Sequence, residues 1–99
     1  MIPVVGFGAG GHAKVVLEIL RSLHGYHIVG LLDAQQELWG KSVLGVEVVG
    51  DDSMMLELKQ RGTTHAFIGV GTAGDAQPRR QLYEKVVGSG FQIVAAIHA

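Results

Sequence analysis

Residues 4–16 constrain the fold of this chain more than any other stretch. An apolar run breaks off in four closely spaced glycines and then resumes with helical periodicity, which predicts a buried strand, a tight turn and the start of a helix. Gly6, Gly8 and Gly11 also have the G-x-G-x-x-G spacing of a phosphate-binding turn. Amides at the start of a helix have no internal acceptor and favour an anion. We therefore predict an anion-binding turn that includes Gly8, Gly10 and Gly11.

The composition narrows the class of protein. The chain has 99 residues, of which 47% are hydrophobic and 17% are charged, so it suits one small folded domain and is too apolar for a disordered segment. A formal net charge of −1 argues against a nucleic-acid-binding surface. The absence of cysteine excludes disulfides, thiolate zinc sites and cysteine nucleophiles. No apolar stretch approaches the roughly 18 residues of a membrane-spanning helix, and we expect a cytoplasmic protein without a membrane or nucleic-acid partner.

Apolar runs of strand length alternate with segments of helical periodicity along the chain. The predicted strands cover residues 2–7, 26–32, 42–49, 65–70 and 91–97, and the predicted helices cover residues 11–24, 53–61 and a segment that begins near Pro78. This alternation is typical of an α/β fold. We predict a small Rossmann-like open sheet, mostly parallel, with helices on both faces and strand order 3-2-1-4-5. Ligands of such sheets bind beyond the carboxyl ends of the strands, where the order reverses.

The predicted helices also indicate which side chains are buried. The first helix has an apolar stripe with the spacing i, i+3, i+4, i+7, formed by Val16, Ile19, Leu20 and Leu23. In the last helix we expect three side chains to face the core: Leu82, Val86 and Val87.

Two polar residues are expected beside the glycine turn. Asp33 follows the second predicted strand, where a carboxylate accepts hydrogen bonds from a ribose hydroxyl or a base N–H, or else forms a turn. His12 opens the first predicted helix, where an imidazole would contact a phosphate or sugar hydroxyl, or would be a solvated residue. The loop that begins at Gly71 should approach the same place.

Other polar residues have ordinary explanations. We expect Asp51 and Asp52 to cap the helix that follows them rather than to bind a metal. Trp39, in a polar loop, would be a plug on the core or, alternatively, a lid over a neighbouring pocket. Three cations would either reach a phosphate or face solvent: Lys14, Arg79 and Arg80. No complete set of acid, base and nucleophile is present, so we predict no catalytic residue.

Four segments of the chain carry a family resemblance: GAGGHAKVV at residues 8–16, VGLLD at 29–33, GVEVVGD at 45–51 and FIGVG at 67–71. Together they resemble the N-terminal domain of bacterial sugar acetyltransferases of the sialic acid O-acetyltransferase and nucleotide-amino-sugar N-acetyltransferase type. These enzymes belong to the left-handed β-helix hexapeptide acyltransferases. The resemblance extends over essentially all 99 residues, and the run GGHAK is its most specific part.

The resemblance implies a function for the domain. In the family this domain binds a nucleotide sugar, typically UDP-linked, for cell-surface polysaccharide biosynthesis. By resemblance, Gly10, Gly11 and His12 would lie against the phosphates and the sugar, and Asp33 would meet the uridine. The family has a second polar or acidic residue after this Asp, whereas this chain has Ala34.

The resemblance also implies a second domain that these 99 residues do not include. In the family a β-helix of hexapeptide repeats follows, binds acetyl-CoA, carries the catalytic histidine and forms trimers. We therefore expect residues 1–99 to be a substrate-binding domain, either excised or naturally separate, that does not transfer acetyl groups alone. The apolar strand predicted at the end of the chain favours excision.

Two other functions are compatible with the same glycine turn. The chain could be the NAD(P)-binding part of an oxidoreductase or epimerase, which uses a similar turn for the pyrophosphate. It could also be a regulatory module that senses a nucleotide.

Overall fold

The computed structural model describes residues 1–23, 25–69 and 77–94, with the side chains of residues 11, 12 and 77–79 excepted. The strands are β1 (Ile2–Phe7), β2 (Tyr26–Leu32), β3 (Ser42–Val43), β4 (Val46–Gly50), β5 (His65–Ile68) and β6 (Gln92–Ile93). The helices are α1 (Gly11–Ser22), α2 (Met55–Gln60) and α3 (Gln77–Gly88), with short 3-10 turns η1 (Gln36–Leu38) and η2 (Asp52–Met54). Within the described ranges, no helix is long and apolar enough to cross a membrane.

The strands form one sheet in the order β3-β4-β2-β1-β5-β6. Every pairing is parallel except that of β3 with β4. The predicted α/β class and strand order are confirmed, and the predicted third strand is a hairpin. Leu44 and Gly45 connect its two strands with φ of 50° and 84°. Positive φ at both central residues matches the twist that a two-residue hairpin needs.

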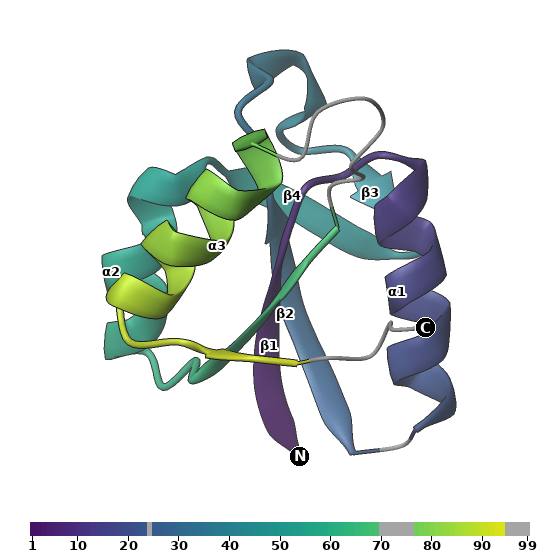
Figure 1. Ribbon diagram of the computed structural model, residues 1–99. Helices are drawn as coiled ribbons and strands as arrows, with labels where there is room; N and C mark the ends of the chain where they lie inside the picture. Colours follow the sequence, from purple (N-terminus) through teal and green to yellow (C-terminus); the bar gives the residue numbers. More distant parts are fainter. Residues whose placement is uncertain (24, 70–76, 95–99) are drawn as a thin grey trace.

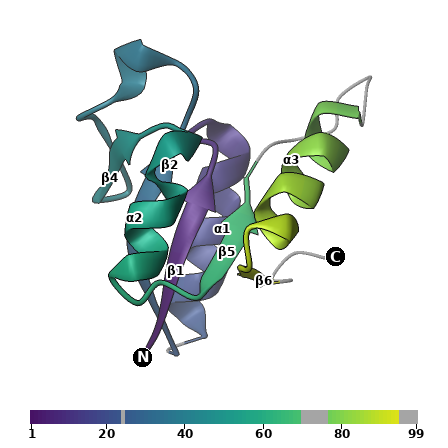
Figure 2. The ribbon, with the colours of Figure 1, turned by 90° about the vertical axis from the view of Figure 1, so that its left-hand side faces the viewer.

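Helices cover both faces of the sheet, as predicted (Figure 1). Helix α1 lies on one face, and α2 and α3 lie on the other. The view turned by 90° shows α2 in front of β1 and α1 behind the sheet (Figure 2). Successive residues of β1 therefore serve different layers: Val4 belongs to the core beneath α1, whereas Val5 and Phe7 belong to the core beneath α2 and α3. A strand buried on both faces reads as a continuous apolar run, which explains the sequence of β1.

The buried stripe of α1 differs from the predicted one. Leu23 lies beyond the last residue of α1 and its side chain is 55% exposed, whereas Leu17 is fully buried. The buried positions of the helix again have the spacing i, i+3, i+4, i+7: Ala13, Val16, Leu17 and Leu20. The predicted spacing is confirmed, and Val16 and Leu20 are buried as predicted, but the stripe begins three residues closer to the N-terminus than predicted, and Ile19 is only half-buried. In α3, Val86 is buried as predicted, but Val87 is 44% exposed.

Gly6 has a packing role inside β1. Its backbone pairs with Leu31 on one side and with Phe67 on the other. A Cβ atom on Gly6 would lie 2.6 Å from Leu31 Cδ2 and from Phe67 Cε2, and closer still to Phe67 Cζ. The ring of Phe67 therefore occupies the space that a side chain on residue 6 would need. The first glycine of the G-x-G-x-x-G spacing serves the core and not, as that spacing suggested, a phosphate.

Candidate functional site

At the carboxyl ends of the central strands, backbone hydrogen bonding continues for one residue beyond the last residues of the strands. The three hydrogen bonds are Gly8 N–H to Leu32 O (2.7 Å), Asp33 N–H to Gly50 O (2.9 Å) and Gly69 N–H to Phe7 O (2.7 Å). The segments that leave β1, β2, β4 and β5 are thereby fixed relative to one another. Polar groups on these segments are presented at one edge of the sheet, as in other open α/β sheets.

An open pocket of about 260 Å³ lies at this edge. It is lined by the last residues of β1 and β2, by residues that follow β1, β2 and β4, and by one residue of α3: Phe7, Gly8, Leu32, Asp33, Ala34, Asp51, Asp52 and Leu82. Two residues predicted from the sequence, Gly8 and Asp33, are among them. The lining thus combines apolar side chains with three carboxylates. The carboxylates can accept hydrogen bonds from hydroxyl, amine or base N–H groups.

The glycine turn joins this pocket to the start of α1. Gly8 is buried and has a φ of 103°, a conformation that side chains rarely adopt. Gly10 is the N-cap of α1, and the helix begins at Gly11 without an acidic residue in its first turn. A Cβ on Gly10 would meet nothing within 4 Å. Gly8 is therefore required by its backbone conformation, whereas Gly10 leaves the approach to the first helical amides open.

A further glycine, Gly69, positions the start of α1 and was not singled out from the sequence. It follows β5 directly, and a Cβ there would lie 3.0 Å from both Cα and Cβ of Ala13. The first turn of α1 is therefore packed closely against the backbone at the end of β5. Gly69 directly follows an apolar strand, as Gly8 follows β1. This position is the feature of the sequence that indicates its role.

Asp33 is hydrogen-bonded through all four of its polar groups. Its amide donates to Gly50 O, and its carbonyl accepts the indole N–H of Trp39 at 2.8 Å. Carboxylate Oδ1 accepts the Gln35 amide at 2.9 Å, and Oδ2 accepts the Ala9 amide at 3.0 Å. The predicted turn-forming role is confirmed by the bond to Gln35. Contact of Asp33 with a ligand stays a prediction.

Trp39 does not plug the core. Its side chain is 37% exposed, and the neighbouring Leu38 is the residue of this loop that packs against the core beneath α1. The indole of Trp39 instead ties the loop after β2 back to Asp33. The sequence placed an aromatic residue in the loop but did not show which of two adjacent apolar side chains turns inward.

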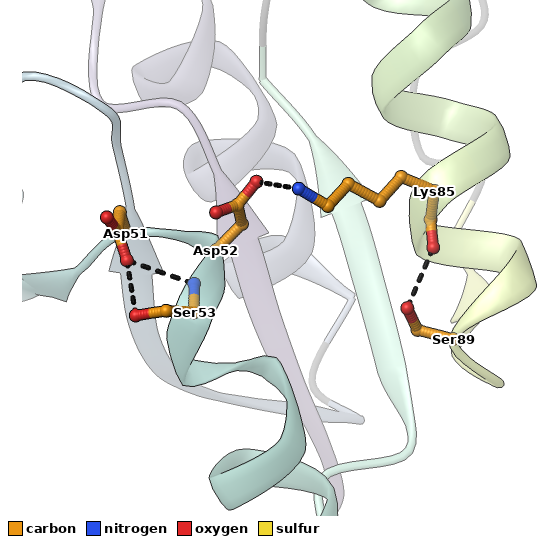
Figure 3. Close-up of polar contacts among 5 residues, drawn as sticks. All are labelled: Asp51, Asp52, Ser53, Lys85 and Ser89. Atoms are coloured by element: carbon orange, nitrogen blue, oxygen red, sulfur yellow. Dashed lines mark hydrogen bonds and ion pairs between the residues drawn. The ribbon is translucent and has the colours of Figure 1, made fainter.

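Asp51 and Asp52 have separate local roles (Figure 3). Asp51 caps the turn that leads into α2: its Oδ1 accepts the Ser53 amide at 2.9 Å and the Ser53 hydroxyl at 2.6 Å, which confirms the capping prediction. The capping prediction is wrong for Asp52, which lies within η2 and forms an ion pair with Lys85 of α3. Hydrogen bonds from Ser53, first from its hydroxyl and then from its amide, hold the pKa of the Asp51 carboxyl below its ordinary value of 3.8. Within the part of the chain that the structure describes, no three His, Asp or Glu side chains are grouped to hold a metal ion.

We expect Asp51→Ala to destabilise the fold in a pH-dependent way. Because the pKa of Asp51 is lowered in the folded state, its contribution is fully present above its unfolded pKa, near 3.8, and is lost as pH falls through the folded value. Melting temperatures of the wild type and Asp51→Ala should therefore differ at neutral pH and converge in acid. Asp51→Asn, which keeps one acceptor oxygen, is the control and should melt closer to the wild type at neutral pH. A constant difference between wild type and Asp51→Ala down to strong acid would contradict this assignment.

The remaining predicted site residues are placed only in part. Gly11 and His12 form the first positions of α1, and the side chain of His12 lies outside the described residues. Gly71 also lies outside them, as does the side chain of Arg79. Lys14 and Arg80 are exposed. The structure therefore brings Gly8 and Asp33 to one pocket and Gly10 to the adjoining helix start.

Comparison with known proteins supports the resemblance seen in the sequence. A perosamine N-acetyltransferase mutant from Caulobacter crescentus, in complex with CoA and GDP-perosamine, is 40% identical with a TM-score of 0.83; the match covers 97% of this chain and 42% of that one. The acetyltransferase domain of PglB from Neisseria gonorrhoeae, in complex with acetyl coenzyme A, is 29% identical with a TM-score of 0.70, over 90% of this chain and 40% of that one. This chain thus spans less than half the length of either protein.

More distant structures share the fold alone. UDP-D-quinovosamine 4-dehydrogenase from Vibrio fischeri has a TM-score of 0.77 at 12% identity, over 93% of this chain and 75% of that one. No curated protein sequence matched the chain. The family model described as the PglD N-terminal domain matches residues 4–86. The chain therefore belongs to the PglD N-terminal domain family, the N-terminal domain of sugar acetyltransferases.

Proposed function

We propose that this chain is the nucleotide-sugar-binding domain of an acetyl-CoA-dependent sugar acetyltransferase. The observation that carries the proposal is the 40% identity, over 97% of the chain, to a perosamine N-acetyltransferase in complex with CoA and GDP-perosamine. Since the chain spans 42% of that protein, we assign acetyl-CoA binding, acetyl transfer and trimer formation to a further domain of a longer, cytoplasmic protein. The domain's own task is to hold the sugar in place for the reaction, which is catalysis by positioning.

The proposed binding mode uses both parts of the site. The diphosphate lies at the start of α1, where the amides at Gly10, Gly11 and His12 and the positive end of the helix dipole favour an anion. The sugar or the base lies in the pocket, where carboxylates accept hydrogen bonds from hydroxyl, amine or ring N–H groups. The imidazole of His12 contacts a phosphate or a sugar hydroxyl. Gly71, which the sequence also predicted, completes the proposed set of binding residues.

The proposal also specifies the base of the nucleotide. The resemblance of the sequence predicts a UDP-linked sugar, while the relative from Caulobacter crescentus is in complex with a GDP-linked one. A pyrimidine and a purine differ in size and in their N–H groups, so this pocket should distinguish them. We keep the UDP-linked sugar as the prediction and GDP-perosamine as its direct competitor.

Titration calorimetry tests the proposal with a UDP-linked amino sugar, GDP-perosamine, NAD and NADP. We expect binding of a nucleotide sugar and none of NAD or NADP. His12→Ala should weaken nucleotide-sugar binding about tenfold, equivalent to one charge-assisted hydrogen bond, with little change in melting temperature. Glu18→Ala, on the exposed face of α1 and one turn beyond the first, is the matched control.

Two outcomes would contradict the proposal. Tight NAD binding without a response to either sugar nucleotide would favour an oxidoreductase. An unchanged affinity together with a large loss of stability in His12→Ala would make His12 structural.

A further inference from the structure

Asp33 connects four segments that surround the site. Through its own backbone and side chain it is bonded to the glycine turn at Ala9, to the end of β4 at Gly50, to the loop at Gln35 and to the end of η1 at Trp39. Two of these bonds are made by its carboxylate, one with each oxygen. A carboxylate that accepts backbone N–H groups on both oxygens is held in one orientation, and it holds its donors in turn.

The bond to Ala9 matters most for the glycine turn. Ala9 lies between Gly8, with a φ of 103°, and Gly10, the N-cap of α1. Glycines on both sides allow this turn many backbone conformations. The charge-assisted bond from the Ala9 amide to Asp33 Oδ2 selects one of them. It also removes the Ala9 amide from the set of donors available to an anion, so the free donors begin at Gly10.

We propose that Asp33 is a positioning residue for the anion site: its carboxylate holds the Ala9 amide and so keeps the amides from Gly10 onward turned toward a bound diphosphate. This inference rests on the proposed function. It differs from the role that the resemblance implies, in which Asp33 meets the nucleoside. Here the carboxylate acts through the backbone of the glycine turn.

The negative charge of Asp33 opposes anion binding, whereas its bond to Ala9 favours it. Whether removal of the carboxylate strengthens or weakens anion binding is therefore informative. A carboxylate beside the turn repels a phosphate by simple electrostatics, so its removal alone would strengthen anion binding. Loss of the bond to Ala9 would release the turn and weaken anion binding, because the donors are then no longer held in place. We expect the loss of orientation to outweigh the relief of repulsion, since water and salt screen the charge at this open pocket.

Asp33→Asn tests the inference in two steps. In the free wild-type protein, amide NMR should show that the Ala9 N–H is protected from hydrogen exchange more strongly than the Gly10 N–H, because the Asp33 carboxylate accepts it, and Ala9 should lose this protection in the variant. The wild-type comparison of Ala9 with Gly10 needs no substitution, so it stands even if the variant folds poorly. Glu37→Gln removes a charge from the same exposed loop without a bond to the turn and should leave Ala9 unchanged.

In the second step, affinities are measured for inorganic pyrophosphate, for uridine and guanosine, and for the nucleotide sugar. Asp33→Asn should weaken pyrophosphate and nucleotide sugar by a similar factor, about tenfold, and spare the nucleosides. Glu37→Gln should not weaken any of them.

The other outcomes would overturn either this inference or the proposed function, and they distinguish between the two. Tighter pyrophosphate binding, or a loss confined to the nucleosides, would overturn the inference and leave the proposed function standing. An Ala9 amide that is no better protected than Gly10 in the wild type, and is unaffected by the substitution, would also overturn it. A wild-type protein that binds none of these ligands would overturn the proposed function, and the role of Asp33 in anion binding with it.

Discussion

Phe67→Ala is expected to lower the free energy of unfolding by about 4 kcal/mol. Phe67 is the largest fully buried side chain among the described residues. It belongs to the core beneath α1, together with Val4, Leu17 and Leu31. Truncation removes apolar contact and leaves a cavity between α1 and the sheet that the hydrogen-bonded strands cannot close. Because small domains are stable by only about 5–15 kcal/mol, this single change takes a large share of the total.

Urea denaturation of the wild type and Phe67→Ala measures this loss. Tyr83→Ala is the matched control, because Tyr83 is an aromatic residue of α3 that is 45% exposed, and it should change stability by less than about 0.5 kcal/mol. A cost below about 1 kcal/mol for Phe67→Ala would mean that the core beneath α1 is not packed as described here.

Gly6→Ala is expected to destabilise the fold by about 3 kcal/mol, at the upper end of the usual cost of overpacking a core. Its Cβ would stand 2.6 Å from both Leu31 Cδ2 and Phe67 Cε2, so the sheet or the ring has to move. Because the obstacle is a side chain, the effect should be coupled to it. The double variant Gly6→Ala/Phe67→Leu should be more stable than the sum of the single effects predicts.

The same denaturation series provides the comparison. Gly88→Ala is the control, because Gly88 is the last residue of α3 and a Cβ there would meet nothing within 4 Å; it should be neutral or slightly stabilising. Additive effects in the double variant would show that Gly6 and Phe67 do not share the same space. They would also reopen a role for Gly6 in the phosphate turn.

Local patterns in the sequence were sufficient for most of the architecture. Continuous apolar runs identified the central strands because a strand buried on both faces has no polar positions. The right-handed crossover of parallel units then left few possible strand orders, and the predicted one is observed. Asp51 was recognised as a cap because capping depends on neighbours two residues away, here Ser53.

Features that depend on distant neighbours were not accessible in this way. Spacing showed that α1 has one buried stripe, but the sheet beneath it determines that Leu17 is inside and Leu23 outside. Likewise, nothing near Trp39 in sequence shows that its indole reaches back to Asp33.

The glycine-rich stretch shows both sides of this division. Its sequence predicted a strand, a turn and a helix, and the carboxyl-end location of the site followed from the fold class. The separate tasks of its glycines come from contacts across the sheet: Gly6 makes room for Phe67, and Gly8 takes a left-handed conformation at the pocket. The Ala9 amide, directly after Gly8, is held by the carboxylate of Asp33, 24 residues away. Backbone preference and periodicity are local and can be read along the chain, whereas steric exclusion and hydrogen-bond partnership exist only between segments that folding brings together.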